Sequence, residues 1–243
     1  MAKIFITGSA DGLGQLSAKL LADQGHEVVL HARNADRAKY ALEKVPDATS
    51  VITGDLSDLE ATKRIAQEVN TMGSFDAIIH NAGVYQASTE EILKVNVLAP
   101  YILTCLIQKP NRLIYLSSGM HLGGQINLEN LKNRRNISYS DSKLYVLMLA
   151  KAVARMWPDV LSNAVDPGWV PTKMGGPGAP DDLQKGCETQ AWLATKNENN
   201  ANVSGQYFYH QAIKPYNLSA NNIALHEKFI TICEAHTGVR FPV

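Results

Sequence analysis

The clearest chemical feature of the sequence is the segment YSDSK at 139–143, which places Tyr139 and Lys143 four residues apart. In a helix, residues at this spacing lie on one face, so the lysine ammonium can approach the tyrosine. An unperturbed tyrosine has a pKa near ~10, and a nearby positive charge lowers that pKa by favouring the phenolate. The spacing therefore favours a tyrosine with a lowered pKa. The alternative is a solvated Tyr–Lys pair on a helix surface.

A second feature is the glycine-rich segment TGSADGLG at 7–14, which contains Gly8, Gly12 and Gly14. It follows an apolar run and precedes a helical pattern, so it forms the turn between a first strand and a first helix. Glycines at such a turn let backbone N–H groups approach a pyrophosphate at the helix N-terminus. The spacing is GxxxGxG, and no GK[ST] sequence follows that would indicate a P-loop. The alternative is a tight turn whose glycines serve packing alone.

Both features lie between strand-like and helix-like segments, which alternate along almost the whole chain. Most strand candidates are continuous apolar runs, as expected where helices cover both faces of a parallel sheet. Repeated β-α-β units imply right-handed crossovers. The sequence therefore predicts one α/β domain over residues 1–243, with a doubly wound parallel sheet of about seven strands in a three-layer α/β/α arrangement. The expected strands are 3–7, 27–32, 50–53, 75–80, 112–117, 160–166 and 205–210, and the expected helices are 13–24, 34–44, 56–70, 93–108 and 139–157.

Further motifs stand where the predicted strands end, which is where open α/β sheets bind ligands. HNAG at 80–83 ends the fourth strand, SSG at 117–119 ends the fifth, and YSDSK opens the long helix. The stretch PGWVPTKMGGPGAP at 167–180 is too long for an ordinary connection, so we expect a functional loop. Its composition is typical of a flexible substrate loop, around residues 168–183, that becomes ordered when ligands bind.

Composition excludes several other classes of function. The 243 residues are 45% apolar and 19% charged, and 23 lysines and arginines balance 23 aspartates and glutamates. A neutral chain lacks the positive field that nucleic-acid or anionic-membrane binding needs. Cys105, Cys187 and Cys233 form neither a CxxC pair nor a Cys/His cluster, so we expect no metal site and no disulfide framework. The sequence shows neither a signal peptide nor a membrane span, which predicts a cytoplasmic protein.

Taken in order, the motifs resemble those of the short-chain dehydrogenase/reductase family. TGxxxGxG, NAG, an asparagine in KVNVLAP at 94–100, a serine, YxxxK and PGxxxT at 167–172 follow that family's order over essentially the whole chain. Retinol-dehydrogenase-like members are the most similar, through the segments 120–131, 181–194 and 204–210. The resemblance implies a Rossmann-type fold and hydride transfer between a nicotinamide cofactor and a small molecule, which is an aldehyde or ketone or the corresponding alcohol.

The resemblance also assigns catalytic roles. It makes Tyr139 the general acid/base and Lys143 the partner that tunes Tyr139 and binds the nicotinamide ribose. Ser118 would hydrogen-bond the substrate carbonyl, with Ser117 as the alternative. Asn96 matches the asparagine that holds a water in the family's proton relay, although an isolated helix asparagine is more often plain polar surface.

The cofactor expected from the resemblance is NADP(H) rather than NAD(H). NAD-preferring relatives place an aspartate at the end of the second strand, where this chain has Ala32 followed by Arg33. A guanidinium can bind a 2′-phosphate through two parallel hydrogen bonds, whereas a carboxylate would repel it; the alternative is an exposed arginine at the strand end. Asp11 in the glycine-rich turn argues mildly against NADP(H), since some NADP-binding members carry a basic residue there. Asp55 matches the family's acid that hydrogen-bonds the adenine amino group; alternatively, it is a loop aspartate near a helix N-terminus. The other expected cofactor contacts are Gly8, Ser9, Gly12, Leu13, Gly14, Asn34, Leu56, Asn81, Ala82, Gly83, Pro167, Gly168, Val170 and Thr172.

Two rival functions share this fold. A non-catalytic NADP(H)-binding redox sensor would usually lack Tyr139 or Lys143, and a sugar-nucleotide epimerase would usually carry TGxxGxxG and a larger C-terminal domain. The family commonly forms homodimers or homotetramers, but KPNR at 109–112 shortens the helix that contributes to subunit contacts there. His121 and Trp169 each have two interpretations, which are contact with the substrate and a purely structural role.

Overall fold

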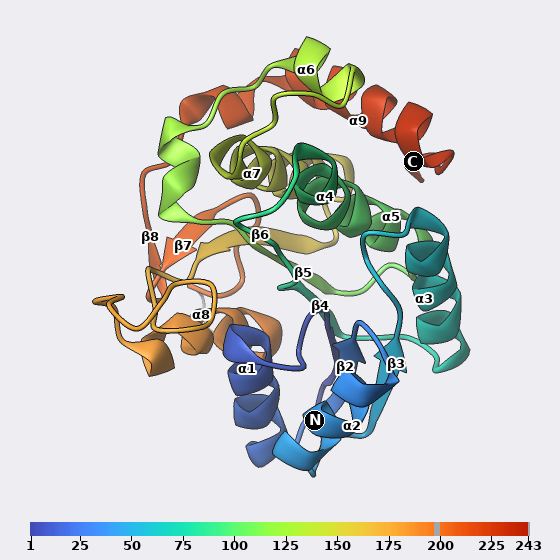
Figure 1. The fold of residues 1–243 in the computed structure, drawn as a ribbon, viewed down its shortest axis with the longest axis vertical. Helices are drawn as coiled ribbons and strands as arrows, with labels where there is room; N and C mark the ends of the chain where they lie inside the picture. The colour runs from blue at the N-terminus through green and yellow to red at the C-terminus, as the bar shows by residue number, and fades with distance from the viewer. Residues whose placement is uncertain (197–199, 243) are drawn as a thin grey trace.

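A single eight-stranded sheet forms the centre of the computed structural model, which describes residues 1–196 and 200–242 (Figure 1). The strand order is β3-β2-β1-β4-β5-β6-β7-β8. All neighbouring strands pair in parallel except β7 and β8, which pair antiparallel. The strands are β1 (Lys3–Ile6), β2 (Glu27–Ala32), β3 (Ser50–Thr53), β4 (Ala77–His80), β5 (Arg112–Leu116), β6 (Leu161–Asp166), β7 (Tyr207–Tyr209) and β8 (Ala212–Ile213).

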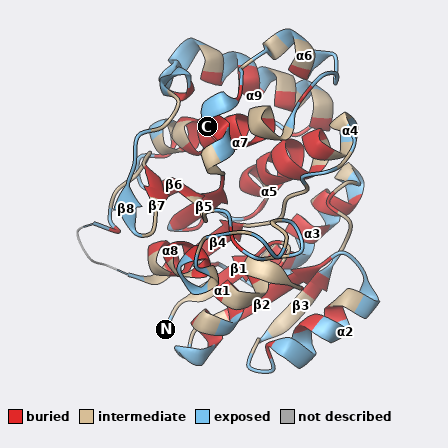
Figure 2. Cartoon of the chain, turned by 60° about the vertical axis from the view of Figure 1, so that its left-hand side comes forward, coloured by how far each residue is buried: buried red, intermediate tan, exposed pale blue. Residues whose placement is uncertain are grey.

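Helices cover both faces of this sheet, and alternate residues of a strand enter two separate cores. In β1, Phe5 packs in one core, whereas Ile4 and Ile6 pack in the other, and all three are fully buried. Helices α1 and α8 lie on one face and α5 and α7 on the opposite face (Figure 1). Figure 2 shows the same pattern as buried strands between helices that are exposed on their outer sides. The predicted three-layer, doubly wound α/β fold is confirmed.

The helical elements include all five predicted helices and also short segments, at 89–92, 119–123 and 128–132, that the sequence did not predict. They are α1 (Gly12–Asp23), α2 (Ala35–Lys44), α3 (Leu59–Thr71), α4 (Thr89–Ile92), the π-helical segment η1 (Leu93–Leu98), α5 (Ala99–Leu106), the 3₁₀ segment η2 (Gly119–Gly123), α6 (Leu128–Lys132), α7 (Tyr139–Met156), α8 (Leu183–Thr195), the 3₁₀ segment η3 (Leu218–Asn221) and α9 (Ile223–Thr237). No helix in the described ranges is both long enough and apolar enough to cross a bilayer.

Two local features position residues of the site. The start of α7 is fixed by a capping box, in which the Ser138 hydroxyl accepts from the Asp141 N–H and the Asp141 carboxylate accepts from the Ser138 N–H. Tyr139 is therefore held in the first turn.

The predicted helix 93–108 begins as a π-helical segment, and Pro100, at the start of α5, has no N–H to donate to the carbonyl of Asn96. Such π segments often occur at functional sites.

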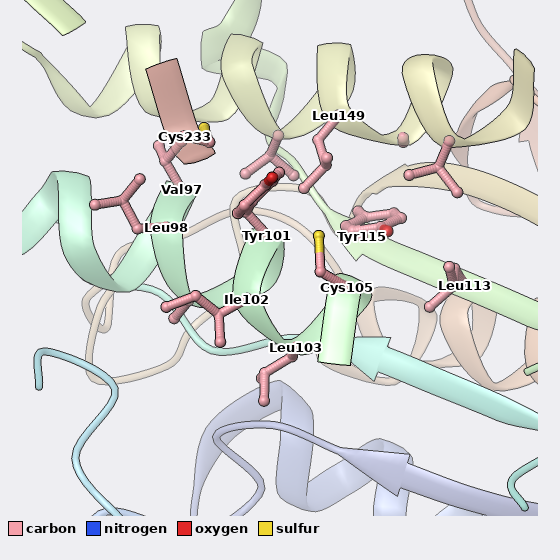
Figure 3. Packing of buried hydrophobic residues seen from close by; sticks show 14 of the residues in the cluster. Val97, Leu98, Tyr101, Ile102, Leu103, Cys105, Leu113, Tyr115, Leu149 and Cys233 are labelled. Atoms are coloured by element: carbon pink, nitrogen blue, oxygen red, sulfur yellow. The ribbon is translucent and has the colours of Figure 1, made fainter. Parts of the chain in front are cut away.

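The structure corrects the prediction mainly at the C-terminal end. It adds the two-residue strand β8, so the sheet has eight strands rather than about seven, and it adds α8 and α9, which the sequence did not predict as helices. The buried face of α9 includes His226 and Thr237, which weaken its apolar pattern. Phe229 of α9 stacks on Tyr145 of α7 with a centroid distance of 5.6 Å. Cys233 of α9 joins Tyr101 of α5 and Leu149 of α7 in the same core (Figure 3).

We predict that Phe229→Ala lowers the free energy of unfolding by about 3–5 kcal/mol, because the fully buried ring would leave a cavity against α7. Urea denaturation followed by circular dichroism measures this change. The matched control is Ile223→Ala on the same helix, where the side chain is 52% exposed and the change should stay within about 0.5 kcal/mol. Equal effects of the two substitutions would show that α9 is not an integral part of the core.

Candidate active site

A cleft with a volume of about 500 Å³ lies where the turns after β1, β2, β4 and β5 meet the start of α7 and the loop after β6. Most of the residues expected from the sequence line it. They are Gly8, Gly12, Leu13, Arg33, Asp55, Leu56, Asn81, Ala82, Gly83, Tyr139, Lys143, Pro167 and Thr172. Chain segments that are far apart in the sequence therefore converge at one edge of the sheet, as the strand-end argument predicts.

The glycine-rich turn packs directly against the turn after β4. Gly8 has a φ of +63°, and a Cβ atom there would lie 2.9 Å from the Cα of Ala82. A Cβ atom on Gly14 would lie 2.3 Å from Nδ2 of Asn81. That amide nitrogen donates to the carbonyl oxygens of Thr7 (2.9 Å) and Gly8 (3.1 Å). Asn81 and Gly14 thus join the ends of β1 and β4 instead of facing the cleft as free groups.

His31 of β2 contacts this turn, and the sequence analysis missed it. The Gly8 N–H donates to its Nδ1 atom at 3.0 Å, so Nε2 carries the proton and donates to the carbonyl of Gly54 at 2.9 Å. Burial lowers the pKa of His31 to about 4, so the ring stays neutral. The available signal was a lone polar residue within the apolar run VVLHA. His31 links the turn after β1 to the loop that carries Asp55.

The N-terminus of α1 has the donors that a phosphate group needs. Asp11 is the N-cap residue, but in the described structure its side chain accepts no hydrogen bond from the helix backbone. The first N–H groups of a helix have no acceptor within the helix, so those of Gly12 and Leu13 are available where these residues line the cleft. The donor set and the narrow glycine cradle fit a dinucleotide cofactor.

Asp11 instead binds two cations that the sequence analysis did not single out. Its Oδ2 atom accepts from Arg37 at 2.6 Å and from Lys173 at 2.9 Å, and all three residues line the cleft. Burial alone would raise the pKa of Asp11, but the hydrogen bonds from Lys173 and Arg37 lower it overall. The Asp11 carboxylate therefore connects the glycine-rich turn to α2 and to the loop after β6, and Arg33, Arg37 and Lys173 make this end of the cleft positive.

Tyr139 and Lys143 lie together at the opposite end of the cleft, as their spacing predicts. The Lys143 Nζ atom is 5.5 Å from the centre of the Tyr139 ring and donates to the carbonyl of Leu116 at 2.8 Å. Burial lowers the pKa of Lys143, whose side chain is nearly inaccessible, to about 8. Burial also raises the pKa of Tyr139 to about 12, against a smaller lowering by a hydrogen bond with Ser118.

The expectation of a lowered tyrosine pKa is therefore wrong for the protein without bound ligands. The i, i+4 spacing gives proximity, but it does not report the loss of hydration, which disfavours the charged phenolate and is the largest cause of the raised pKa. In this state Tyr139 is a protonated phenol at neutral pH and is ready to donate rather than to accept a proton.

The two serines at the end of β5 have different partners. The Ser117 hydroxyl lines the cleft but donates to the carbonyl of Lys143 at 2.8 Å, so it is engaged in holding α7. The Ser118 hydroxyl accepts from the Met120 N–H and interacts with the Tyr139 hydroxyl. This geometry favours Ser118 over Ser117 as the residue beside the reacting group.

Asn96 is buried, and its Oδ1 atom and the Lys143 Nζ atom both lie close to Gly83. A Cβ atom on Gly83 would lie 3.2 Å from the Lys143 Nζ atom and 3.4 Å from the Asn96 Oδ1 atom. The Asn96 amide exchanges hydrogen bonds with both backbone groups of Val84 and donates to the Ser142 hydroxyl. Its side chain therefore holds the turn after β4 against α7, and its role in a water relay stays a prediction.

His121 and Trp169 both make contacts within the protein, and their contact with the substrate stays a prediction. His121 is fully buried; its Nδ1 atom donates to the Ser118 carbonyl at 2.7 Å, and its Nε2 atom accepts from the Asn217 N–H at 3.2 Å. These contacts are structural. Trp169 is 60% exposed and donates from its indole N–H to the carbonyl of Gly175 at 2.8 Å, so it closes a turn of its own loop.

Several expected cofactor contacts do not line the cleft. The Ser9 side chain is fully buried and bonds the backbone of Ile6 and His31, and Asn34 caps α2 by accepting from the Arg37 N–H. Gly168 and Val170 lie behind Pro167 and Thr172 in the loop after β6, and Val170 is buried. Gly14 and the catalytic candidates Asn96 and Ser118 are also not among the residues that line the cleft. Within the described ranges, no three potential metal-ligating side chains come together.

Comparison with known proteins gives a consistent result over the whole chain. The family profile described as short chain dehydrogenase matches residues 2–182. An uncharacterized oxidoreductase of Emericella nidulans is 44% identical, with 100% of this chain and 99% of that protein aligned. A short-chain dehydrogenase of Penicillium rubens is 38% identical, with full coverage of both chains. Mouse retinol dehydrogenase 14 is a more distant relative, with 29% identity over 71% of this chain and 62% of its own length.

Solved structures share the fold at low identity. An uncharacterized protein from Mycobacterium paratuberculosis superposes with a TM-score of 0.83 at 24% identity, covering 100% of this chain and 96% of that one. The NADPH-bound carbonyl reductase from chicken fatty liver superposes with a TM-score of 0.70 at 19% identity, covering 89% and 99% of the two chains. At these identities the similarity establishes the fold alone.

We predict that Lys143→Met stabilises the ligand-free protein. The pKa of Lys143 is 10.5 in the unfolded chain and about 8 in the folded protein, so between these values the unfolded chain holds the proton more tightly. The parent's unfolding free energy should therefore rise with pH across this window, and below it the buried charge costs about 3 kcal/mol. The variant should gain up to that amount at pH 7, with the gain shrinking toward pH 10.

Urea denaturation at several pH values measures the difference between variant and parent. Lys39→Met, which replaces an exposed lysine of α2, is the control and should show no such trend. A Lys143→Met gain that does not change between pH 7 and pH 10 would contradict the perturbed lysine.

Proposed function

Because this chain belongs to the short-chain dehydrogenase family, we propose that it is an NADP(H)-dependent oxidoreductase that interconverts an aldehyde or ketone and the corresponding alcohol. One observation carries the proposal: the Tyr139 hydroxyl interacts with Ser118 while buried Lys143 lies under its ring, at the end of a cleft that fits a dinucleotide. A protonated phenol between a second hydroxyl and an ammonium group is suited to donate a proton to a carbonyl oxygen.

The residues that would hold the cofactor extend along the cleft from the glycine-rich turn to Lys143. Backbone N–H groups of Gly12 and Leu13 would bind its pyrophosphate, with Thr172 beside them, and Asp55 would contact the adenine. When bound, the cofactor supplies or accepts the hydride, and its oxidised form adds a positive charge near Tyr139.

The protein's own contribution is to place and tune the proton donor. Ser118 would hydrogen-bond the carbonyl oxygen of the substrate and orient it toward Tyr139. In the direction of reduction, Tyr139 would donate its proton to that oxygen, and the neighbouring Lys143 ammonium would stabilise the resulting phenolate. Lys143 is protonated at neutral pH because its pKa, although lowered, stays near 8. The proton would then be replaced through the polar groups around Asn96.

The preference for NADP(H) is supported by the charge at the other end of the cleft. Arg33 is exposed there, and Arg37 and Lys173 stand beside it around Asp11. Ala32, at the end of β2, offers no carboxylate to bind a free ribose diol. The chicken carbonyl reductase that shares this fold binds NADPH.

The loop around residues 168–183 would act as a cover for the bound cofactor. Its Lys173 reaches across to Asp11 in the glycine-rich turn, a contact between residues 162 positions apart. We also propose that residues 1–243 form a single domain, because strands β1 to β8 all belong to one sheet.

We predict that Tyr139→Phe lowers kcat for carbonyl reduction by at least about 100-fold, because it removes the transferable proton and keeps the ring. NADPH oxidation over a panel of aldehydes and ketones measures kcat, and NADPH binding should be nearly unchanged. The control is Tyr145→Phe on the same helix, whose hydroxyl bonds the Asn127 carbonyl away from the cleft. Parent-like turnover by Tyr139→Phe would exclude Tyr139 as the acid.

We also predict that the parent prefers NADPH to NADH and that Arg33→Ala reduces kcat/KM for NADPH by about 10- to 150-fold, the range for a charge-assisted hydrogen bond. Values for NADH should change little, because NADH has no 2′-phosphate. Arg135→Ala, at an exposed position outside the cleft, serves as the control. A parent that prefers NADH, or a variant equally impaired with both cofactors, would overturn the cofactor assignment.

A further inference from the structure

A group of charged side chains at the positive end of the cleft joins three distant parts of the chain. Asp11 stands in the glycine-rich turn, Arg37 in α2 and Lys173 in the loop after β6, and all three line the cleft. Arg37 donates to the Asp11 Oδ2 atom at 2.6 Å, and Lys173 donates to the same atom at 2.9 Å. One carboxylate oxygen therefore holds two cations side by side.

The Asp11 carboxylate does not neutralise this end of the cleft. Arg33 lines it as well, so three positive charges face one negative charge there. Asp55 and Glu91 are the other carboxylates that line the cleft, and within the described ranges neither forms an ion pair with these cations. The excess of positive charge attracts a further anion.

Both cations that bind Asp11 keep hydrogen-bond donors for such an anion. The contact with Asp11 uses only one N–H group of the Arg37 guanidinium and one of the Lys173 ammonium, and each cation has others. The Arg37 and Asp11 side chains are 37% and 31% exposed, so solvent screens their charges only in part. Lys173 is 78% exposed, so its contact contributes less to binding.

The position of the group fits the 2′-phosphate of the proposed cofactor. Asp11 directly precedes Gly12, whose N–H would bind the pyrophosphate, and Arg37 is in the helix that follows Arg33. The loop that carries Lys173 also lies against this turn, because a Cβ atom on Gly12 would be 3.8 Å from the Thr172 Cγ2 atom. The ion pair of Asp11 and Arg37 thus extends from the pyrophosphate donors to the helix after Arg33.

Asp11 does not have the usual structural role of an aspartate at a helix start. An N-cap aspartate commonly accepts from the first N–H groups of its helix. The Asp11 side chain accepts no such bond in the described structure, and its carboxylate binds the two cations instead. An anion that holds the donors a phosphate needs will compete with that phosphate.

We propose that Asp11 is an internal competitor for the 2′-phosphate of NADP(H), which takes over the Arg37 and Lys173 donors that Asp11 holds in the free protein. This inference rests on the proposed use of NADP(H) and names the residue that limits the preference for it. Lys173 would at the same time connect the loop after β6 to the bound phosphate.

Isothermal titration calorimetry with adenosine 2′,5′-bisphosphate and 5′-AMP tests this proposal, because the two ligands differ only by the 2′-phosphate and need no turnover. The decisive quantity is the ratio of their affinities. Asp11→Asn keeps the size of the side chain and removes its charge. It should raise the affinity for the bisphosphate about 3- to 10-fold and that for 5′-AMP less than about 2-fold. Damage to the fold would not produce such a gain.

Two further variants remove the donors. Arg37→Ala should weaken bisphosphate binding about 10-fold, and Lys173→Ala, at a more exposed position, about 2- to 5-fold, with little change for 5′-AMP. The matched control for Asp11→Asn is Asp23→Asn, which removes the ion pair with Lys19 at 3.0 Å on the outer side of α1 and should keep the parent's ratio. The gain of Asp11→Asn should shrink as salt rises.

The outcomes separate this inference from the function on which it rests. If the parent binds the bisphosphate no more tightly than 5′-AMP, the proposed preference for NADP(H) fails. If the parent prefers the bisphosphate but Asp11→Asn leaves the ratio unchanged or lowers it, Asp11 is not a competitor and the inference is overturned. Equal gains for both ligands would also overturn it, because the competition would then concern the 5′-phosphate.

A ratio that rises in Asp11→Asn and falls in Arg37→Ala supports the inference. An unchanged ratio in Lys173→Ala would overturn the proposed connection between the loop and the phosphate.

Discussion

The burial of the Lys143 ammonium beneath Tyr139 is the constraint on which the rest of the site depends. A charge in this position loses hydration, and the Leu116 carbonyl, at the end of β5, compensates for only part of the loss. The surrounding polar groups hold the lysine's environment in place. Ser117 bonds the Lys143 carbonyl, and Asn96 links α7 to the turn after β4 through Ser142 and Val84. The buried ammonium thus lowers stability while these bonds fix its position beside the Tyr139 ring.

The two ends of the cleft differ in their charged groups, since Lys143 and Asp166 provide one charge of each sign near Tyr139. Arg37 and Lys173 bind Asp11 and Arg33 lines the same end of the cleft, where the adenosine end of a cofactor would lie, whereas Asp166 provides a negative charge near Tyr139. A phosphate-bearing ligand is attracted to the end that carries the excess of positive charge. This polarity fits a phosphorylated dinucleotide whose reactive ring points toward an uncharged, polar substrate.

The fold and the location of the site were largely predictable from the sequence, because continuous apolar runs indicate parallel strands and the motifs at their ends meet at one edge. Features that depend on distant partners were not predictable. Asp11 accepts a hydrogen bond from Lys173, which is 162 residues away in the sequence. His31 accepts one from the Gly8 N–H of the glycine-rich turn. The buried face of α9 includes the polar residues His226 and Thr237. The pKa of Tyr139 was mispredicted because residue spacing shows proximity and not the loss of hydration.

The most direct test of the buried tyrosine–lysine pair is an NMR titration of Tyr139 in protein labelled with ¹³C at the tyrosine ζ-carbon. Tyr139→Phe assigns the resonance, and the titration is repeated with saturating NADP⁺. We expect a pKa of about 12 without the cofactor and a lower pKa with it, because the oxidised cofactor adds a positive charge beside Lys143. A Tyr139 pKa near or below ~10 in the free protein, or one that NADP⁺ leaves unchanged, would contradict this description of the site.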